Sequence, residues 1–88
     1  MFLKELIKKE ILRDMVKSRR WGGKHTELRN LSKGISNYVL STSQGRKIFD
    51  KAVKELINSG WLFAKKSTGE IHVSLNPHYS KEILEFIA

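Results

Sequence analysis

An 88-residue chain with 40% apolar residues is long enough for one small hydrophobic core, and this composition excludes wholesale disorder. The chain has no cysteine, which excludes disulfides and thiolate metal sites and fits a reducing compartment. Seventeen basic residues against nine acidic ones give a formal net charge of +8, which attracts phosphate backbones, acidic membranes or acidic proteins.

The N-terminal segment, from Phe2 to about Lys17, is predicted to form an amphipathic helix, because its apolar residues recur at helical spacing. A charged residue occurs every few positions, which excludes a signal peptide or a membrane span, so we expect a cytoplasmic protein. The apolar face from Phe2 to Val16 is broad for one small core. The part of this apolar face that the core does not cover could pack against a second chain, so a homodimer is one expected assembly.

The next stretch of the chain is less regular. A short helix is predicted from Glu27 to about Lys33, with His25 or Thr26 as its N-cap. Gly34 suits the left-handed conformation that often follows a helix. The segment Ile35–Ser41 has no clean period but is too apolar for an open loop, so we expect a packed turn or a short extra helical piece.

The strongest helical pattern runs from Ser43 to Asn58. We expect Ser43 to be the N-cap, with Thr42 as its rival, and Gly60 to end the helix. The apolar positions form an unbroken i, i+3, i+4 stripe: Ile48, Phe49, Ala52, Val53, Leu56 and Ile57. The opposite face is mostly charged, so this helix has one buried and one exposed side.

Two short strands follow, at Trp61–Lys65 and Glu70–Leu75, and Thr68-Gly69 supplies the turn between them. The second strand alternates, which predicts one buried face and one wet face: Ile71, Val73 and Leu75 against His72 and Ser74. Asn76-Pro77 then ends the strand and begins a last helix, with Asn76 as its cap.

This order of elements predicts a single α+β domain, mostly α, over residues 1–88. We expect a three-helix core, a two- or three-stranded sheet formed around the β-hairpin, and a C-terminal helix. No repeat, low-complexity tract or linker interrupts the chain.

The exposed face of the Ser43–Asn58 helix and the basic turn that follows are the candidate DNA-binding surface. Near the start of a recognition helix Gln44 can pair with adenine and Arg46 with guanine, whereas lysines contact phosphates. Gly45 lacks a side chain and would let the backbone approach a phosphate. The loop before the Glu27–Lys33 helix supplies further phosphate candidates. The full candidate set is Lys24, His25, Thr26, Ser43, Gln44, Arg46, Lys47, Lys51, Lys54, Lys65, Lys66, Ser67 and Thr68.

Each candidate also has an ordinary structural explanation. Lysines on a helix usually form a solvated face, and lysines in a hairpin are the usual guard of an exposed strand edge. Arg19 and Arg20 can interact with the carbonyls that close the first helix. Trp21 is expected to pack in the core or at an interface, and Trp61 is expected to pack in the core. Only the placement of helix and hairpin together favours DNA.

Catalytic chemistry has little support in this sequence. The three histidines, His25, His72 and His78, are scattered, and none has a partner at metal-ligand spacing. No nucleophile elbow or phosphate-binding glycine loop is present. We therefore expect a non-enzyme with no catalytic residue, no cofactor, no metal ligand and no small-molecule substrate.

Several segments resemble a known family. Lys24-His25-Thr26, Asn30–Ile35, Val73–Pro77 and Lys81-Glu82-Ile83 are similar to segments of small stand-alone archaeal proteins with a winged helix-turn-helix DNA-binding domain. The function of that group is uncharacterised. The resemblance covers nearly the whole chain, although the Leu-Asn-Pro junction is a structural signature and not a chemical site.

The resemblance implies a recognition helix at Ser43–Asn58 and a wing at Lys65–Thr68. The domain would bind double-stranded DNA as a nucleoid-associated transcriptional regulator or chromatin protein. The Ile35–Ser41 connection departs from the pattern, because it is longer than the three or four residues of a compact helix-turn-helix. The alternative function is a protein–protein interaction module that docks through the first helix or the wing. RNA binding is disfavoured, because we expect no aromatic cluster on the exposed strand face.

Overall fold

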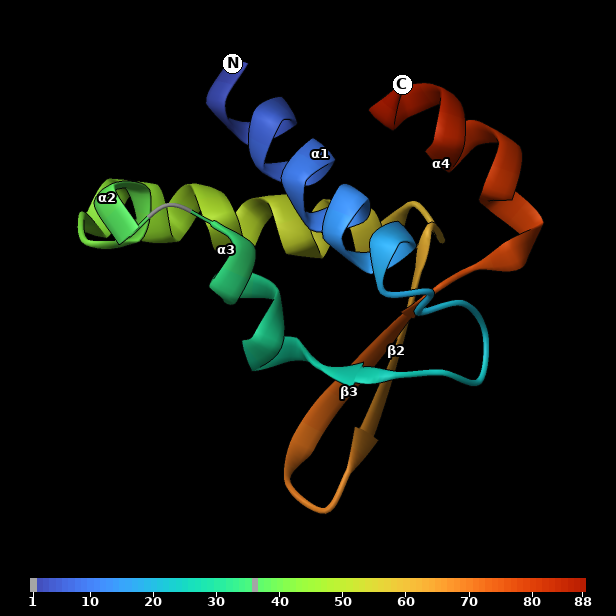
Figure 1. Ribbon diagram of the computed structural model, residues 1–88. Coiled ribbons are helices and arrows are strands. Elements are labelled where there is room, and N and C mark those ends of the chain that lie inside the picture. The colour runs from blue at the N-terminus through green and yellow to red at the C-terminus, as the bar shows by residue number, and fades with distance from the viewer. Residues whose placement is uncertain (1, 36) are drawn as a thin grey trace.

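The computed structural model describes residues 2–35 and 37–88. This part of the chain contains four α-helices, two 3₁₀-helices and one three-stranded antiparallel sheet, arranged as in Figure 1. In chain order they are α1 (Phe2–Lys17), β1 (Thr26–Glu27), the 3₁₀-helix η1 (Leu28–Gly34), α2 (Asn37–Leu40), α3 (Ser43–Asn58), β2 (Leu62–Ser67), β3 (Glu70–Leu75), the 3₁₀-helix η2 (Pro77–Tyr79) and α4 (Ser80–Ile87). The predicted class, α+β and mostly helical, is confirmed. None of the helices described here is long and apolar enough to cross a membrane.

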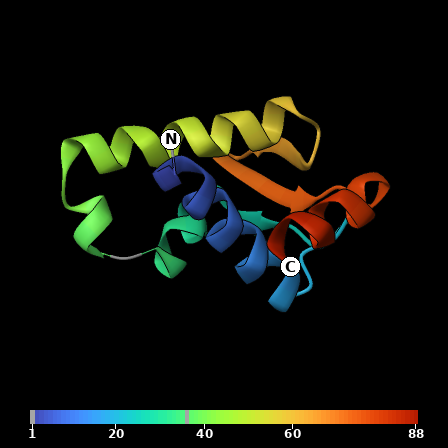
Figure 2. The same ribbon diagram turned by 90° about the horizontal axis from the view of Figure 1, so that it is seen from above.

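The core lies where α1 packs against α3 and the sheet, and Figure 2 shows α1 between α3 and α4. The predicted apolar stripe of α3 is confirmed, with its centre buried and its two end isoleucines half-buried. The side chains with no exposed surface come from both long helices, the sheet and α4: Ile11, Leu12, Ala52, Val73, Leu75 and Ile83. Burying one large aliphatic side chain contributes about 1.5–3 kcal/mol, so this cluster determines how the elements pack.

The sheet has the order β1-β3-β2, and the sequence analysis missed its first strand. Thr26 pairs with Val73 and Glu27 with His72, so β1 occupies the second edge of β3. The expected N-caps, His25 and Thr26, are therefore wrong: η1 begins only at Leu28, after an extended Glu27 that makes no side-chain cap. The physical reason is that the backbone groups on that edge of β3 need partners, and β1 supplies them.

The hairpin is close to its prediction. The second strand, Glu70–Leu75, is confirmed, whereas the first begins at Leu62 and extends to Ser67. Thr68 and Gly69 have φ values of 48° and 82°, and Ser67 pairs with Glu70 across them. Positive φ at both central residues is the type I′ arrangement, which matches the twist of the two strands.

The predicted alternation of β3 is only partly correct. Val73 and Leu75 are buried, but Ile71 is 40% exposed and Ser74 only 1% exposed. Ile71 lies near the turn, where the hairpin extends beyond the core. Ser74 lies at the opposite end, where β3 is flanked by β2 on one side and by the Arg20–Gly22 segment on the other.

Two helix ends also differ from expectation. Gly34 does not adopt a positive φ; it closes η1 against α1, where an added Cβ would lie 1.5 Å from Oδ2 of Asp14. Asn76 accepts a hydrogen bond from the His78 amide as predicted, but it caps the η2 turn and α4 begins only at Ser80.

The short helix α2 confirms the extra helical piece expected between Ile35 and Ser41, although Ser36 lies outside the described residues. Gly60, with φ of 84°, ends α3 as predicted.

A charge cluster joins α1 to α3. Both Lys4 and Lys8 donate to the carboxylate of Glu55 at 2.6 Å. These two hydrogen bonds lower the pKa of Glu55 from 4.5 to about 2. The cluster therefore favours one orientation of α3 on α1 at neutral pH.

Glu55→Gln is expected to lower the melting temperature by a few degrees at about pH 7, because the glutamine cannot hold two ammonium groups. The folded pKa lies below the unfolded one, so the stabilisation is present above about pH 4.5 and is lost as the pH falls toward 2. Thermal unfolding between about pH 7 and pH 2 measures the difference between the two proteins. Glu10→Gln is the control, since Glu10 pairs with Arg13 within α1 alone. A difference that does not shrink with falling pH contradicts this account.

Candidate nucleic-acid interface

The start of α3 is set by Thr42. Its side-chain oxygen accepts a hydrogen bond from the Gly45 amide at 2.9 Å, and Ser43 is already the first helical residue. The prediction of Ser43 as N-cap is therefore wrong, and its rival Thr42 takes that role. Ser43 and Gln44 are both exposed in the first turn.

Gly45 has a packing role. It is buried, and an added Cβ would lie 1.9 Å from the carbonyl oxygen of Val39 and 2.8 Å from Oγ1 of Thr42. The backbone that Gly45 brings close is thus α2, and its amide already donates to Thr42. This overturns the interpretation of Gly45 as an approach point for a phosphate.

Three lysines lie along the outer face of α3. Lys47, Lys51 and Lys54 are exposed and spaced by four and three residues, so they share one face, which we call the lysine ridge. Among the described residues, no ion pair involves any of them. Two acidic residues of α3 lie near the ridge. Glu55 is turned toward α1 and is paired there with Lys4 and Lys8, whereas Asp50 is exposed beside the ridge but forms no ion pair with it among the described residues. The ridge therefore has three cations and one neighbouring carboxylate.

The hairpin tip carries the second group of candidates, and Lys65, Lys66, Ser67 and Thr68 are all exposed. Lys65 lies opposite His72 and Lys66 opposite Ile71 in the register, so the two lysines project from opposite faces of the hairpin. Neither forms an ion pair within the described chain. The tip thus has one cation on each side.

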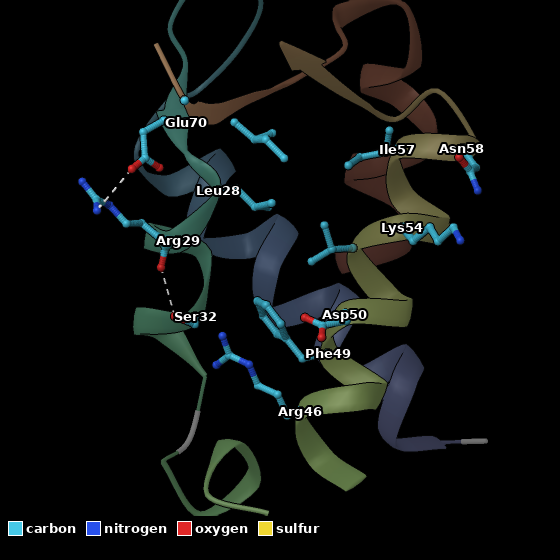
Figure 3. Close-up of a pocket in the computed structure, with 13 residues that line it drawn as sticks. Leu28, Arg29, Ser32, Arg46, Phe49, Asp50, Lys54, Ile57, Asn58 and Glu70 are labelled. Carbon is cyan, nitrogen blue, oxygen red and sulfur yellow. Dashed lines mark hydrogen bonds and ion pairs between the residues drawn. The ribbon is translucent and has the colours of Figure 1, made fainter. Parts of the chain in front are cut away.

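Figure 3 shows a groove between η1 and α3, closed at one end by the hairpin, with a volume of about 550 Å³. We call it the η1–α3 groove. Its floor is apolar and comes from all three elements: Leu28, Phe49, Val53, Ile57 and Ile71. Its rim is charged: Arg29, Arg46, Asp50, Lys54 and Glu70. No local sequence pattern predicts this groove, because its walls come from segments far apart in the chain.

Arg46 belongs to this groove and not to the lysine ridge. Its guanidinium carbon lies 5.9 Å from the centre of the Phe49 ring, a cation–π arrangement over the groove floor. Ridge and groove are therefore adjacent surfaces of one helix. Of the two expected base-reading side chains, only Gln44 is left outside the groove lining.

Sequence analysis also missed Arg29. Its Nε lies 2.6 Å from a carboxylate oxygen of Glu27, and its Nη1 lies 3.4 Å from Oε1 of Glu70. Arg29 thus connects η1 to the base of the hairpin turn, as the dashed line in Figure 3 shows for Glu70. The contact with Glu70 spans forty-one positions of sequence, and no local pattern could have predicted it.

The three candidates that precede η1, Lys24, His25 and Thr26, do not form one surface with the lysine ridge. Lys24 and His25 are exposed, whereas Thr26 is half-buried in β1 and its hydroxyl oxygen accepts a hydrogen bond from Asn30 at 3.2 Å. The guanidinium of Arg20 donates to the carbonyl of His25, whereas the backbone amide of Arg20 donates to the carbonyl of Met15 in the last turn of α1. Nothing in these contacts joins the loop to the lysine ridge.

The outer face of the sheet carries an exposed aromatic ring. Phe63 is 46% exposed, and the register places it on the same face as Lys65 and His72. The rings of His25 and His72 lie 6.3 Å apart, edge to face. Phe63 is a single exposed ring on this face, so the expected absence of an aromatic cluster there stays a prediction.

No known protein-family model matches this chain, and no curated protein or solved structure is significantly similar to it. Within the described residues, no cluster of three metal-ligating side chains is present. Function must therefore be argued from the surfaces of this chain alone.

Gly45→Ala is expected to destabilise the fold by about 1–3 kcal/mol, because the new methyl group collides with the backbone of α2. The higher helix propensity of alanine, worth about 1 kcal/mol, opposes but does not cancel this cost. Urea unfolding measures the change. Gly23→Ala is the matched control, since nothing lies within 4 Å of a Cβ there and its φ is not positive. Equal stability of the two variants would contradict the packing role.

Proposed function

We propose that this chain binds double-stranded DNA, with the lysine ridge of α3 and the hairpin tip as its contact surface. The observation that carries the proposal is a set of five exposed lysines that form no ion pair with any described residue: Lys47, Lys51, Lys54, Lys65 and Lys66. Acidic partners are available in this chain and are used elsewhere, as at Glu55 and Glu70. A surface built for solubility alone intersperses both signs of charge.

The arrangement of elements supports a winged helix-turn-helix architecture. Helices α1, η1 and α3 precede a hairpin that follows α3 directly, and β1 completes the sheet. In such a domain α3 is the recognition helix, η1 crosses the DNA backbone and the hairpin is the wing. This chain differs in its longer connection between η1 and α3, which contains α2. A transcriptional regulator or a chromatin-associated protein is the role that we infer for it.

Phosphate contacts supply most of the affinity in this account. Gln44 in the first turn of α3 is the side chain best placed for base contact, since Arg46 is directed into the groove. We therefore expect weak sequence discrimination, set largely by the phosphate backbone.

Neutralising about five phosphates gives a slope of log K against log salt of about −4.5. Replacing Lys47, Lys51 and Lys54 by glutamine is expected to reduce the magnitude of that slope by about 2.5 and to weaken binding similarly for all sequences. Fluorescence anisotropy with a mixed-sequence duplex, between about 50 and 200 mM salt, measures both quantities.

The control variant also loses three positive charges, but from other helices: Lys9 and Lys17 on α1 and Lys81 on α4 are replaced by glutamine. It is expected to keep a slope close to that of the unmodified chain. Equal losses in the two triple variants would show that net charge alone drives binding, and a salt-insensitive affinity would exclude phosphate contacts.

The second candidate function is a protein-interaction module, and exposed apolar side chains favour it. Leu6 of α1 is 56% exposed and Leu84 of α4 is 46% exposed. Either side chain suits a homodimer or a partner protein. Absence of duplex binding at low salt, together with a solution mass above that of one chain, would favour this candidate over DNA binding.

A further inference from the structure

We propose that the η1–α3 groove is a binding site for a small amphiphilic anion, an aromatic or aliphatic ring system that carries one carboxylate. We further infer that the occupied groove weakens DNA binding. The ligand site stands on the geometry of the groove, whereas its effect on DNA rests on the proposed function.

The size and lining of the groove suit a small molecule. Its volume of about 550 Å³ lies within the range of about 300–1,000 Å³ that is typical of small-molecule sites. Leu28 comes from η1, Phe49 and Val53 from α3, and Ile71 from the hairpin, so an apolar ring meets aliphatic or aromatic surface on three sides. Ile71 is 40% exposed in the chain as it stands, and a bound ring would cover it.

The charges on the rim favour an anion. The groove is lined by three cations and two carboxylates. Arg29 is paired with Glu70 and, outside the lining, with Glu27, which leaves Arg46 and Lys54 beside Asp50 as the charges that a ligand meets. Arg46 has no acidic partner among the described residues, and its contact with Phe49 holds the guanidinium over the floor. A ring that lies on Phe49 therefore brings its carboxylate to Arg46, where a charge-assisted hydrogen bond forms.

Asp50 is the one rim group that opposes an anion. It lies one helical turn beyond Arg46, is exposed, and forms no ion pair within the described chain. Because Asp50 repels an anion and attracts a cation, a variant without its charge tests the sign of the ligand's charge. Removal of the aspartate charge should strengthen the binding of an anion and weaken the binding of a cation.

The walls of the groove are the elements that contact DNA in the proposed function. Lys54 belongs both to the groove lining and to the lysine ridge. An anion held there lowers the positive potential that attracts phosphates, so ligand and DNA compete. By linkage, each must then weaken the binding of the other by the same factor.

The test uses 2-naphthoate as the probe and neutral 2-naphthamide as its matched analogue, added to the full chain without DNA. Amide chemical shifts are expected to change around Leu28, Phe49 and Ile71. Arg46→Gln should weaken naphthoate about threefold or more and leave naphthamide within about twofold, whereas Asp50→Asn should tighten naphthoate. Arg13→Gln is the control, because Arg13 lies on α1 and contacts Glu10 and the end of α4.

Several results would overturn the site. These are no binding at millimolar naphthoate, shifts centred away from the groove, or equal affinity for acid and amide in every variant. Anisotropy with duplex DNA then tests the coupling separately. Weaker duplex binding with naphthoate supports it, and unchanged duplex binding overturns it. A chain that binds naphthoate in the groove but no duplex would support the site and overturn the proposed function.

Discussion

The packing of α3 against α1 fixes which side chains of α3 face solvent, and the functional surfaces depend on that rotation. Phe49, Ala52 and Leu56 are buried on one side of the helix. Burial of large apolar side chains is worth about 1.5–3 kcal/mol each, whereas an exposed ion pair contributes about 0–1 kcal/mol. The apolar stripe therefore sets the rotation, and the pairs of Glu55 with Lys4 and Lys8 only reinforce it.

With that rotation fixed, α3 presents two adjacent surfaces. Lys47 and Lys51 are exposed on the ridge and Arg46 and Asp50 border the groove beside η1, whereas Lys54 belongs to both surfaces. Arg29 joins η1 to the hairpin through its contact with Glu70, and α3 forms the opposite wall of the groove. One helix thus presents a ridge of lysines next to an apolar groove, at whose rim the Arg46 guanidinium has no acidic partner among the described residues.

Local patterns in the sequence were sufficient for the elements that carry strong periodicity. Helix α1, helix α3, strand β3 and the turn at Thr68-Gly69 all follow from spacing and turn chemistry. Strand β1 was missed because two residues are too short for any periodicity, and only the free edge of β3 explains them.

The candidate site was predictable in part. The exposure of the lysine ridge follows from the helical period alone. The positions of Arg29 and Arg46 depend on contacts between distant segments, as does the burial of Gly45 under α2. Sequence reasoning therefore found the charges but not the groove between them, because a groove is a property of tertiary packing.

The most direct test of the central claim is a map of amide chemical shifts when a short mixed-sequence duplex is added to the isotopically labelled chain at low salt. The account predicts the largest changes at Lys47, Lys51 and Lys54 and along the hairpin tip at Lys65–Thr68, with little change in α4. Changes concentrated around Leu6 and Leu84, or no change at all, would contradict it.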